Sequence, residues 1–180
     1  MPMPDSMPLR LFLDTGVIID GCTSSWSPSK AVLILVSQYP KRYTIVLAAE
    51  VEGELLLALD RKVLQVKKSL TRRGVAGADM TAQGIKDGAV EWLTRVRLER
   101  QPACSQMEIE RHKPHILPAL HHENDVPPVV AAMNSSSDWV ISNNDRHWNA
   151  ELAARTGLRI ATAYTFLEQL SLGHVIPRPP

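Results

Sequence analysis

The chain has 180 residues, of which 44% are hydrophobic and 22% charged, so it is long enough to bury one sizeable core and too short to make two domains the default. Its formal net charge of +1 excludes a strongly basic or acidic chain that would demand a partner of opposite charge. The longest apolar run, Tyr43 to Ala49, is far shorter than the roughly 20 residues of a membrane helix, and the start of the chain lacks an apolar signal segment. We therefore expect a cytoplasmic protein with no membrane association.

Both ends of the chain are expected to lie outside the fold. Residues 1–8 carry three prolines and three methionines without periodicity, and residues 174–180 end in Pro-Arg-Pro-Pro. A single domain over residues 9–173 is the prediction.

Short apolar runs rich in β-branched residues predict four strands, at Leu9–Leu13, Tyr43–Leu47, Trp139–Ser142 and Leu158–Ala163. Helical patterns separate them: a helix capped by Ser27 with Pro28 at its first position, and helices over Ala48–Leu59, Met80–Arg100, Val126–Met133 and Tyr164–Leu172. Strands that alternate with helices, several of them apolar throughout, indicate a sheet covered on both faces. The predicted class is α/β, a three-layer α/β/α fold with a central, mainly parallel sheet of four or five strands.

The segment 61–120 contains no convincing strand, which predicts a helical insertion in the middle of the domain. Its first part, residues 61–74, holds six basic residues and no acidic one. We expect four of these to bind nucleic acid: Lys67, Lys68, Arg72 and Arg73. A solvated helix face is the alternative.

Acidic residues lie where the predicted strands end and where helices pack near those ends. Asp14 follows the first strand, Asp145 follows the strand 139–142, Asp125 begins a helix, and Glu54 lies inside the second helix. Ligands of parallel sheets bind beyond the carboxyl ends of the strands, so these side chains are expected to converge. Carboxylates from different elements are typical ligands of Mg²⁺ or Mn²⁺, and such an ion supports phosphodiester hydrolysis.

Each of these residues also has a purely structural interpretation. Asp14 and Asp125 stand at helix starts, where a carboxylate can cap free N–H groups. Glu54 shares a helix face with Glu50 and can belong to a solvated surface. The adjacent histidines 121–122 precede a helix and are interpreted as exposed loop residues rather than as ligands.

Four segments carry these acidic residues in a fixed order: Leu11–Ile19, Ala48–Leu55, Asn124–Ala132 and Asp138–Trp148. Together they resemble the PIN domain, a family of metal-dependent nucleases that includes the toxins of many bacterial toxin–antitoxin pairs. The resemblance covers residues 9–60 and 121–172 and leaves the middle of the chain unexplained.

The resemblance implies four catalytic residues: Asp14, Glu54, Asp125 and Asp145. It places Mg²⁺ or Mn²⁺ on Asp14 and Asp125, with a water or second ion on Glu54. The last ligand position is ambiguous: counting from Ser142 selects Asn144, whereas the following Asp-Arg-His-Trp favours Asp145. An Asn ligand would bring one charge fewer and weaken the metal affinity.

Neighbouring residues have supporting roles in this interpretation. Thr15 and Ser142 are predicted to orient the ligands through hydrogen bonds. Arg146 is expected either to contact a phosphate or to pair with a nearby carboxylate. Gly16 stands where the family commonly has Asn, which removes a hydrogen bond that supports the site.

The resemblance implies an endoribonuclease that cleaves single-stranded or structured RNA and leaves a 5′-phosphate and a 3′-hydroxyl. An antitoxin protein and a homodimer are the expected partners besides RNA. The alternative is a catalytically weak or inactive PIN-like module that binds RNA or a protein.

The tripeptide Asp14-Thr-Gly16 also matches the catalytic loop of aspartic proteases. Only one copy is present, and the helical content opposes that fold. A phosphatase with Asp14 as its nucleophile usually has a second Asp two residues later, where this chain has Gly16.

Overall fold

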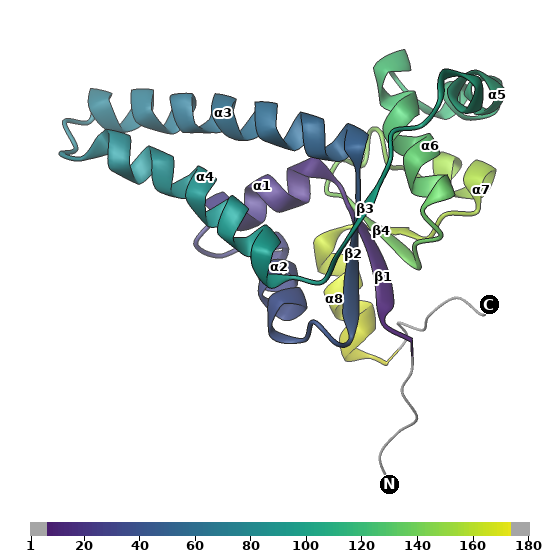
Figure 1. Cartoon of the computed structure of the whole chain (residues 1–180), viewed down its shortest axis with the longest axis horizontal. Coiled ribbons are helices and arrows are strands. Elements are labelled where there is room, and N and C mark those ends of the chain that lie inside the picture. The colour runs from purple at the N-terminus through teal and green to yellow at the C-terminus, as the bar shows by residue number, and fades with distance from the viewer. Residues whose placement is uncertain (1–6, 174–180) are drawn as a thin grey trace, which may run out of the picture.

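Five parallel strands form the centre of the protein (Figure 1). A computed structural model describes residues 7–173. The sheet order is β3-β2-β1-β4-β5, with β1 at Leu9–Leu13, β2 at Tyr43–Ala48, β3 at Leu98–Gln101, β4 at Trp139–Ile141 and β5 at Ile160–Ala161. Every neighbouring pair is parallel, which confirms the predicted α/β class.

Eight α-helices in the described part of the chain cover the sheet: α1 Thr15–Thr23, α2 Pro28–Gln38, α3 Ala49–Arg72, α4 Ala78–Arg95, α5 Gln106–Ile116, α6 Val126–Asn134, α7 Ala150–Thr156 and α8 Ala163–Ser171. One hydrophobic core joins the sheet to α1, α2 and α8, and a second joins it to α6 and α7. The three-layer α/β/α arrangement is therefore confirmed.

The central strand β1 contributes to both cores. Leu11 and Leu13 belong to the core on the α1 side, whereas Phe12 between them belongs to the other and lies 6.0 Å from Trp148 between ring centroids. Successive side chains of a strand point to opposite faces, so a strand covered on both sides must be apolar throughout. This explains the apolar run Leu11–Leu13, whereas Arg10 at the other end of β1 is only half-buried.

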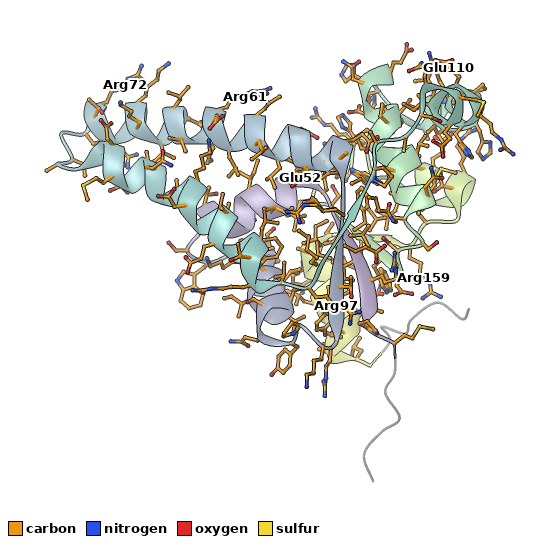
Figure 2. The ribbon with its side chains drawn as sticks, in the orientation of Figure 1. Glu52, Arg61, Arg72, Arg97, Glu110 and Arg159 are labelled. Atoms are coloured by element: carbon orange, nitrogen blue, oxygen red, sulfur yellow. The ribbon has the colours of Figure 1, made fainter. Side chains whose placement is uncertain are left out.

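The sequence prediction for residues 61–120 is wrong in two respects. The helix expected to end at Leu59 continues as α3 to Arg72, and α3 and α4 form a long hairpin that projects from the sheet (Figures 1 and 2). The segment also contains β3, since the helix expected to reach Arg100 ends at Arg95. β3 is a four-residue edge strand that contains Glu and Arg. Its sequence is therefore too short and too polar to show the apolar pattern by which strands are predicted.

Local capping signals agree with the remaining elements. The Ser27 side chain accepts a hydrogen bond from the Lys30 backbone N–H at 3.1 Å, which confirms the predicted start of α2. A helix after Asp14 and helical structure within 61–120 are expected without bounds, and the structure supplies these as α1 and α5; Ser105 and Glu108 form a capping box at the start of α5. The sequence patterns do not predict α7. The expected tails, 1–8 and 174–180, lie outside the described residues except for residues 7 and 8.

Within residues 7–173, the structure contains no helix that is both long and apolar enough to span a membrane.

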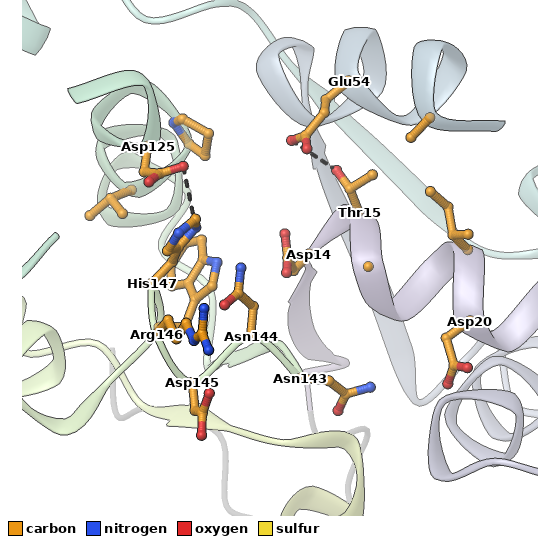
Figure 3. Close-up of a pocket in the computed structure, with 16 residues that line it drawn as sticks. Asp14, Thr15, Asp20, Glu54, Asp125, Asn143, Asn144, Asp145, Arg146 and His147 are labelled. Atoms are coloured by element: carbon orange, nitrogen blue, oxygen red, sulfur yellow. Dashed lines mark hydrogen bonds and ion pairs between the residues drawn. The ribbon is translucent and has the colours of Figure 1, made fainter. Parts of the chain in front are cut away.

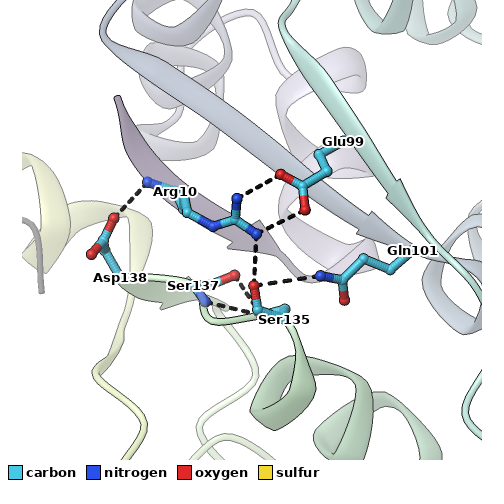
Figure 4. A network of polar contacts seen from close by, with 6 residues as sticks. All are labelled: Arg10, Glu99, Gln101, Ser135, Ser137 and Asp138. Atoms are coloured by element: carbon cyan, nitrogen blue, oxygen red, sulfur yellow. Dashed lines mark hydrogen bonds and ion pairs between the residues drawn. The ribbon is translucent and has the colours of Figure 1, made fainter. Parts of the chain in front are cut away.

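Arg10 of β1 ties the sheet to the turn before β4 (Figure 4). Its guanidinium donates two hydrogen bonds to the Glu99 carboxylate, at 2.6 and 2.8 Å, and one to the Ser135 carbonyl at 2.8 Å. The hydrogen bonds from Arg10 lower the pKa of Glu99. The Arg10 backbone N–H donates to Asp138 at 2.7 Å, so the same residue also fixes the start of β4.

Replacing Arg10 with Ala is expected to lower the free energy of unfolding by about 1–2 kcal/mol at pH 7, because the Glu99 carboxylate loses its charged donor and the Ser135 carbonyl keeps only the longer hydrogen bond from Gln101, at 3.4 Å. A lowered pKa in the folded state makes this contribution present above the ordinary carboxyl pKa and lost as the pH falls through the folded value. Urea denaturation at pH 7 and pH 3 measures it. Arg100→Ala, an exposed change on β3 next to Glu99, is the control and should cost under about 0.5 kcal/mol; an equal loss in both variants would contradict the assignment.

Candidate active site

A cavity of about 740 Å³ opens at the carboxyl ends of β1 and β4. The strands β2 and β3 lie on one side of β1, and β4 and β5 lie on the other. The direction in which successive strands are added therefore reverses between β1 and β4. Residues from α1, α3, the start of α6 and the loop after β4 line the cavity (Figure 3). A reversal of strand order is where open α/β sheets bind their ligands.

Asp14, the first residue after β1, lines this cavity. The Ser142 hydroxyl donates a hydrogen bond to Asp14 Oδ2 at 2.6 Å, and the Asp14 backbone N–H donates to the Ile141 carbonyl at 3.0 Å. Burial raises the pKa of Asp14, the Ser142 hydrogen bond opposes this, and the nearby charge of Glu54 raises the pKa further. The Asp14 carboxylate therefore lies at the end of β4 in surroundings that, on balance, disfavour its charged form.

Glu54 faces Asp14 from α3. The hydroxyl of Thr15, a buried residue, donates a hydrogen bond to Glu54 Oε2 at 3.2 Å. Glu50, one turn earlier, does not share this environment: its Oε1 accepts a hydrogen bond from the Cys104 backbone N–H at 2.6 Å. The expectation that both glutamates point in one direction is wrong, because α3 passes between the cavity and the segment that follows β3.

Asp125 lines the opposite side of the cavity at the start of α6. Its Oδ1 lies 3.3 Å from His147 Nδ1, and its Oδ2 is buried without a hydrogen-bond partner in the described residues. Neither Asp125 nor Asp14 makes a side-chain cap hydrogen bond to the helix that follows it. The capping interpretation therefore fails for both carboxylates.

The loop after β4 distinguishes between the two residues proposed for the fourth position. Asn143 is structural: its side chain donates to Ser29 Oγ at 2.8 Å and accepts from the Ala163 backbone N–H at 3.1 Å. Figure 3 shows Asn144 pointing towards Asp14 and Asp145 pointing away from it. Although both residues line the cavity, Asn144 is the one placed beside the first carboxylate.

His147 and Asp20 also line the cavity and are functional candidates that sequence reasoning missed. The Asp-Arg-His-Trp segment could have indicated His147, since it follows the ambiguous position directly. Arg146 lines the cavity, and it has no ion pair within residues 7–173, so its predicted pairing with a carboxylate is not found. The histidines 121–122 are exposed, as expected, with ring centroids 6.3 and 6.2 Å from that of His147.

The four basic residues predicted to bind nucleic acid, Lys67, Lys68, Arg72 and Arg73, are not among those lining the cavity. They lie at the far half of α3 and just beyond its end. Lys67 pairs with Asp79 of α4 at 2.9 Å, whereas the other three line a separate depression.

The structure is similar to a chain in the crystal structure of VapBC2 from Rickettsia felis bound to a DNA fragment from their promoter, with a TM-score of 0.51 over 86% of this chain and 98% of that chain. The chain has a PIN-like fold. The two sequences are 12% identical, so this similarity concerns the fold alone. No protein-family model and no protein of curated function matches the sequence.

The donor chemistry of this PIN-like fold fits a hard divalent cation. Asp14 carries a carboxylate charge that burial and Glu54 disfavour, and Asp125 has a buried oxygen without a partner. No group of three His, Cys, Asp or Glu side chains within residues 7–173 is arranged to enclose one ion. Mg²⁺ does not need such a group, since it keeps several waters and is usually held by one or two carboxylates. The residues present therefore suit a water-rich site rather than an all-protein cage.

Asp14→Asn is expected to raise the free energy of unfolding by about 0.5–2 kcal/mol at pH 7 in EDTA. The folded-state pKa of Asp14 is raised, so this residue favours folding at low pH and loses that contribution as the pH rises through the folded value. An amide removes the buried charge and still offers Ser142 an acceptor. Chemical denaturation at pH 7 and pH 3.5 measures the gain, which should shrink at the lower pH.

The exposed change Asp145→Asn is the matched control and should alter stability by less than about 0.5 kcal/mol. Destabilisation by Asp14→Asn at pH 7 would show that the carboxylate is already compensated in the folded protein.

Proposed function

We propose that the protein is an Mg²⁺- or Mn²⁺-dependent endoribonuclease of the toxin–antitoxin type. One observation carries the proposal: Asp14, Glu54, Asp125 and Asn144 come from four different elements and line one cavity at the point where the strand order reverses. The PIN-like fold supports it, because this is the arrangement that the sequence resemblance implies.

Each residue has a role that follows from its contacts. Asp14 and Asp125 would hold the cation, with the Asn144 side chain as a neutral oxygen donor. Glu54, oriented by Thr15, would accept a hydrogen bond from an attacking water. When bound, the cation lowers the pKa of a water and stabilises charge on the scissile phosphate and leaving oxygen.

Arg146 and His147 extend the site towards the substrate. Arg146 has no ion pair in the described part of the chain and lines the cavity, so its guanidinium is available to a phosphate oxygen. His147 holds Asp125 by one oxygen and leaves the other oxygen for a ligand. The expected products carry a 5′-phosphate and a 3′-hydroxyl.

An antitoxin is the proposed protein partner, and VapBC2, with its bound promoter DNA, is the structural neighbour that supports it. An acidic cavity would attract an Arg or Lys of such a partner, which would occupy the place of the cation. A homodimer is proposed on the same resemblance.

Cleavage of a mixed single-stranded RNA pool, with Mn²⁺ or Mg²⁺ and beside EDTA, tests the proposal. Cleavage that needs the cation and yields 5′-phosphate ends is the expected result. No cleavage by a folded protein that also fails to bind Mn²⁺ in calorimetry would favour the second candidate, a non-catalytic PIN-like module that binds RNA or a protein. The observation that favours this second candidate is the pairing of Asp125 with His147, because it already engages one oxygen of a carboxylate that would hold the cation.

A further inference from the structure

The face of α3 that lines the cavity continues for three further turns as a basic surface. Glu54 and Ala58 line the cavity. Residues three or four apart lie on one side of a helix, so Arg61, Gln65, Lys68 and Arg72 follow them on the same side. Figure 2 shows Arg61 and Arg72 on the same side of α3.

The charges on this face are exposed and unpaired. Arg61, Lys68 and Arg72 are exposed and have no ion pair within the described residues. The acidic residue nearest to them on α3, Asp60, is engaged by Lys86 of α4 at 2.6 Å. No acidic residue occurs in the sequence from 61 to 74. The face therefore presents positive charge that nothing in the described protein neutralises.

The far end of the face is also shaped to receive a ligand. A shallow depression of about 370 Å³ is lined by five residues of this region: Gln65, Lys68, Ser69, Arg72 and Arg73. Its lining contains three cations, an amide and a hydroxyl, which are hydrogen-bond donors suited to phosphate oxygens.

Lys67 does not belong to this surface. It pairs with Asp79 of α4 at 2.9 Å, which directs it to the other helix of the hairpin. It has the same charge and lies on the same helix, and it is exposed like Lys68. Lys67 is therefore a natural control for any effect of charge alone.

We propose that Arg61, Lys68 and Arg72 form a track along α3 that holds the backbone of single-stranded RNA and leads it into the cavity. At 1.5 Å per residue, the track spans about 16 Å from Arg61 to Arg72, and Arg61 lies about 10 Å along α3 from Glu54 of the cavity. Grooves of this kind follow several nucleotides of a single strand through its phosphates, without reading the bases. The choice of RNA rests on the proposed function, whereas the placement of the track rests on α3 itself.

The test is binding of a fluorescent 15-nucleotide single-stranded RNA by anisotropy, in EDTA and with Asp14→Asn as the background so that the RNA stays intact. The track variant is Arg61→Ala/Lys68→Ala/Arg72→Ala. It should bind about 10²-fold more weakly at 0.1 M salt, and the slope of log affinity against log salt should fall by about 2, which is three contacts at roughly 0.7 each. Lys68→Ala alone should weaken binding about fivefold.

The control variant Lys41→Ala/Lys67→Ala/Arg95→Ala removes the same net charge from exposed residues outside the track, since Lys41 precedes β2 and Arg95 ends α4. It should change the affinity by less than about threefold and leave the salt slope unaltered. Equal losses in both triple variants, or an unchanged affinity of the track variant, would overturn the proposal. Loss of poly-L-glutamate binding by the track variant with unchanged binding of RNA would also overturn it, since the surface would then serve an acidic protein.

Cleavage is measured separately, which keeps the two proposals apart. Cation-dependent cleavage together with track-independent RNA binding would reject the track alone. Track-dependent binding without cleavage would reject the nuclease and leave the track in place.

Discussion

Asp14→Asn is expected to lower the rate of RNA cleavage by roughly 10³-fold or more while the protein stays folded. The amide keeps the shape of the side chain and its contact with Ser142, but it removes the charge of one of the carboxylates that line the cavity. A metal site with one carboxylate fewer binds its ion more weakly and offers less stabilisation to the charged phosphate. Single-turnover cleavage of a labelled RNA at saturating Mn²⁺ measures the effect.

Asp145→Asn, prepared in the same way, is the matched control because it removes the same charge from a side chain that points away from Asp14. Its rate should stay within about threefold of the wild type. Cleavage by Asp14→Asn at the wild-type rate would mean either that the activity comes from a contaminating nuclease or that the cavity is not the active site.

Asn144→Ala is expected to lower cleavage by about 10–100-fold, whereas Asp145→Ala should change it by less than about threefold. The reason is the direction of the two side chains, of which only that of Asn144 points towards Asp14. Matched single-turnover assays on the two variants decide between them.

Asn144→Asp extends this comparison. This change adds a carboxylate to those of Asp14, Glu54 and Asp125, so the negative charge of the site increases. The affinity for Mn²⁺, measured by calorimetry, should therefore rise about tenfold. A greater loss from Asp145→Ala than from Asn144→Ala, or an unchanged affinity in Asn144→Asp, would assign the ligand position to Asp145 instead.

The fold could be predicted from the sequence where burial leaves a clear pattern. The strands β1 and β2 are covered on both faces, so they are mostly apolar, and the predicted bounds match β1 and fall one residue short of the end of β2. β3 could not be predicted in this way, because an edge strand pairs on one side only and needs no continuous apolar run. Glu99 of β3 accepts hydrogen bonds from Arg10 of β1, and a contact between residues so far apart in the chain cannot be predicted from the sequence pattern.

The candidate site was predictable in composition but not in orientation. The sequence indicates that Asp14, Glu54 and Asp125 come from elements that meet at one edge of the sheet, and the structure places all three around one cavity. The resemblance selects Glu54, but the helix face that Glu54 and Glu50 share does not show that Glu50 instead accepts a hydrogen bond from the Cys104 backbone N–H after β3.

The loop after β4 shows the same limit at shorter range. Asn143, Asn144 and Asp145 are adjacent, so the backbone turn decides which one faces the cavity. That turn is fixed by hydrogen bonds of Asn143 to residues of α2 and α8, which are distant in sequence. The role of His147 was not predicted for a similar reason, because its partner Asp125 lies on another element that is distant in the sequence.

The central claim is that the cavity binds a divalent cation through Asp14, and titration calorimetry with Mn²⁺ tests it most directly. The wild type and Asp145→Asn should bind one or two ions per chain with equal affinity, and Asp14→Asn should bind at least about tenfold more weakly. Equal binding by all three proteins, or no binding by the folded wild type, would contradict the account.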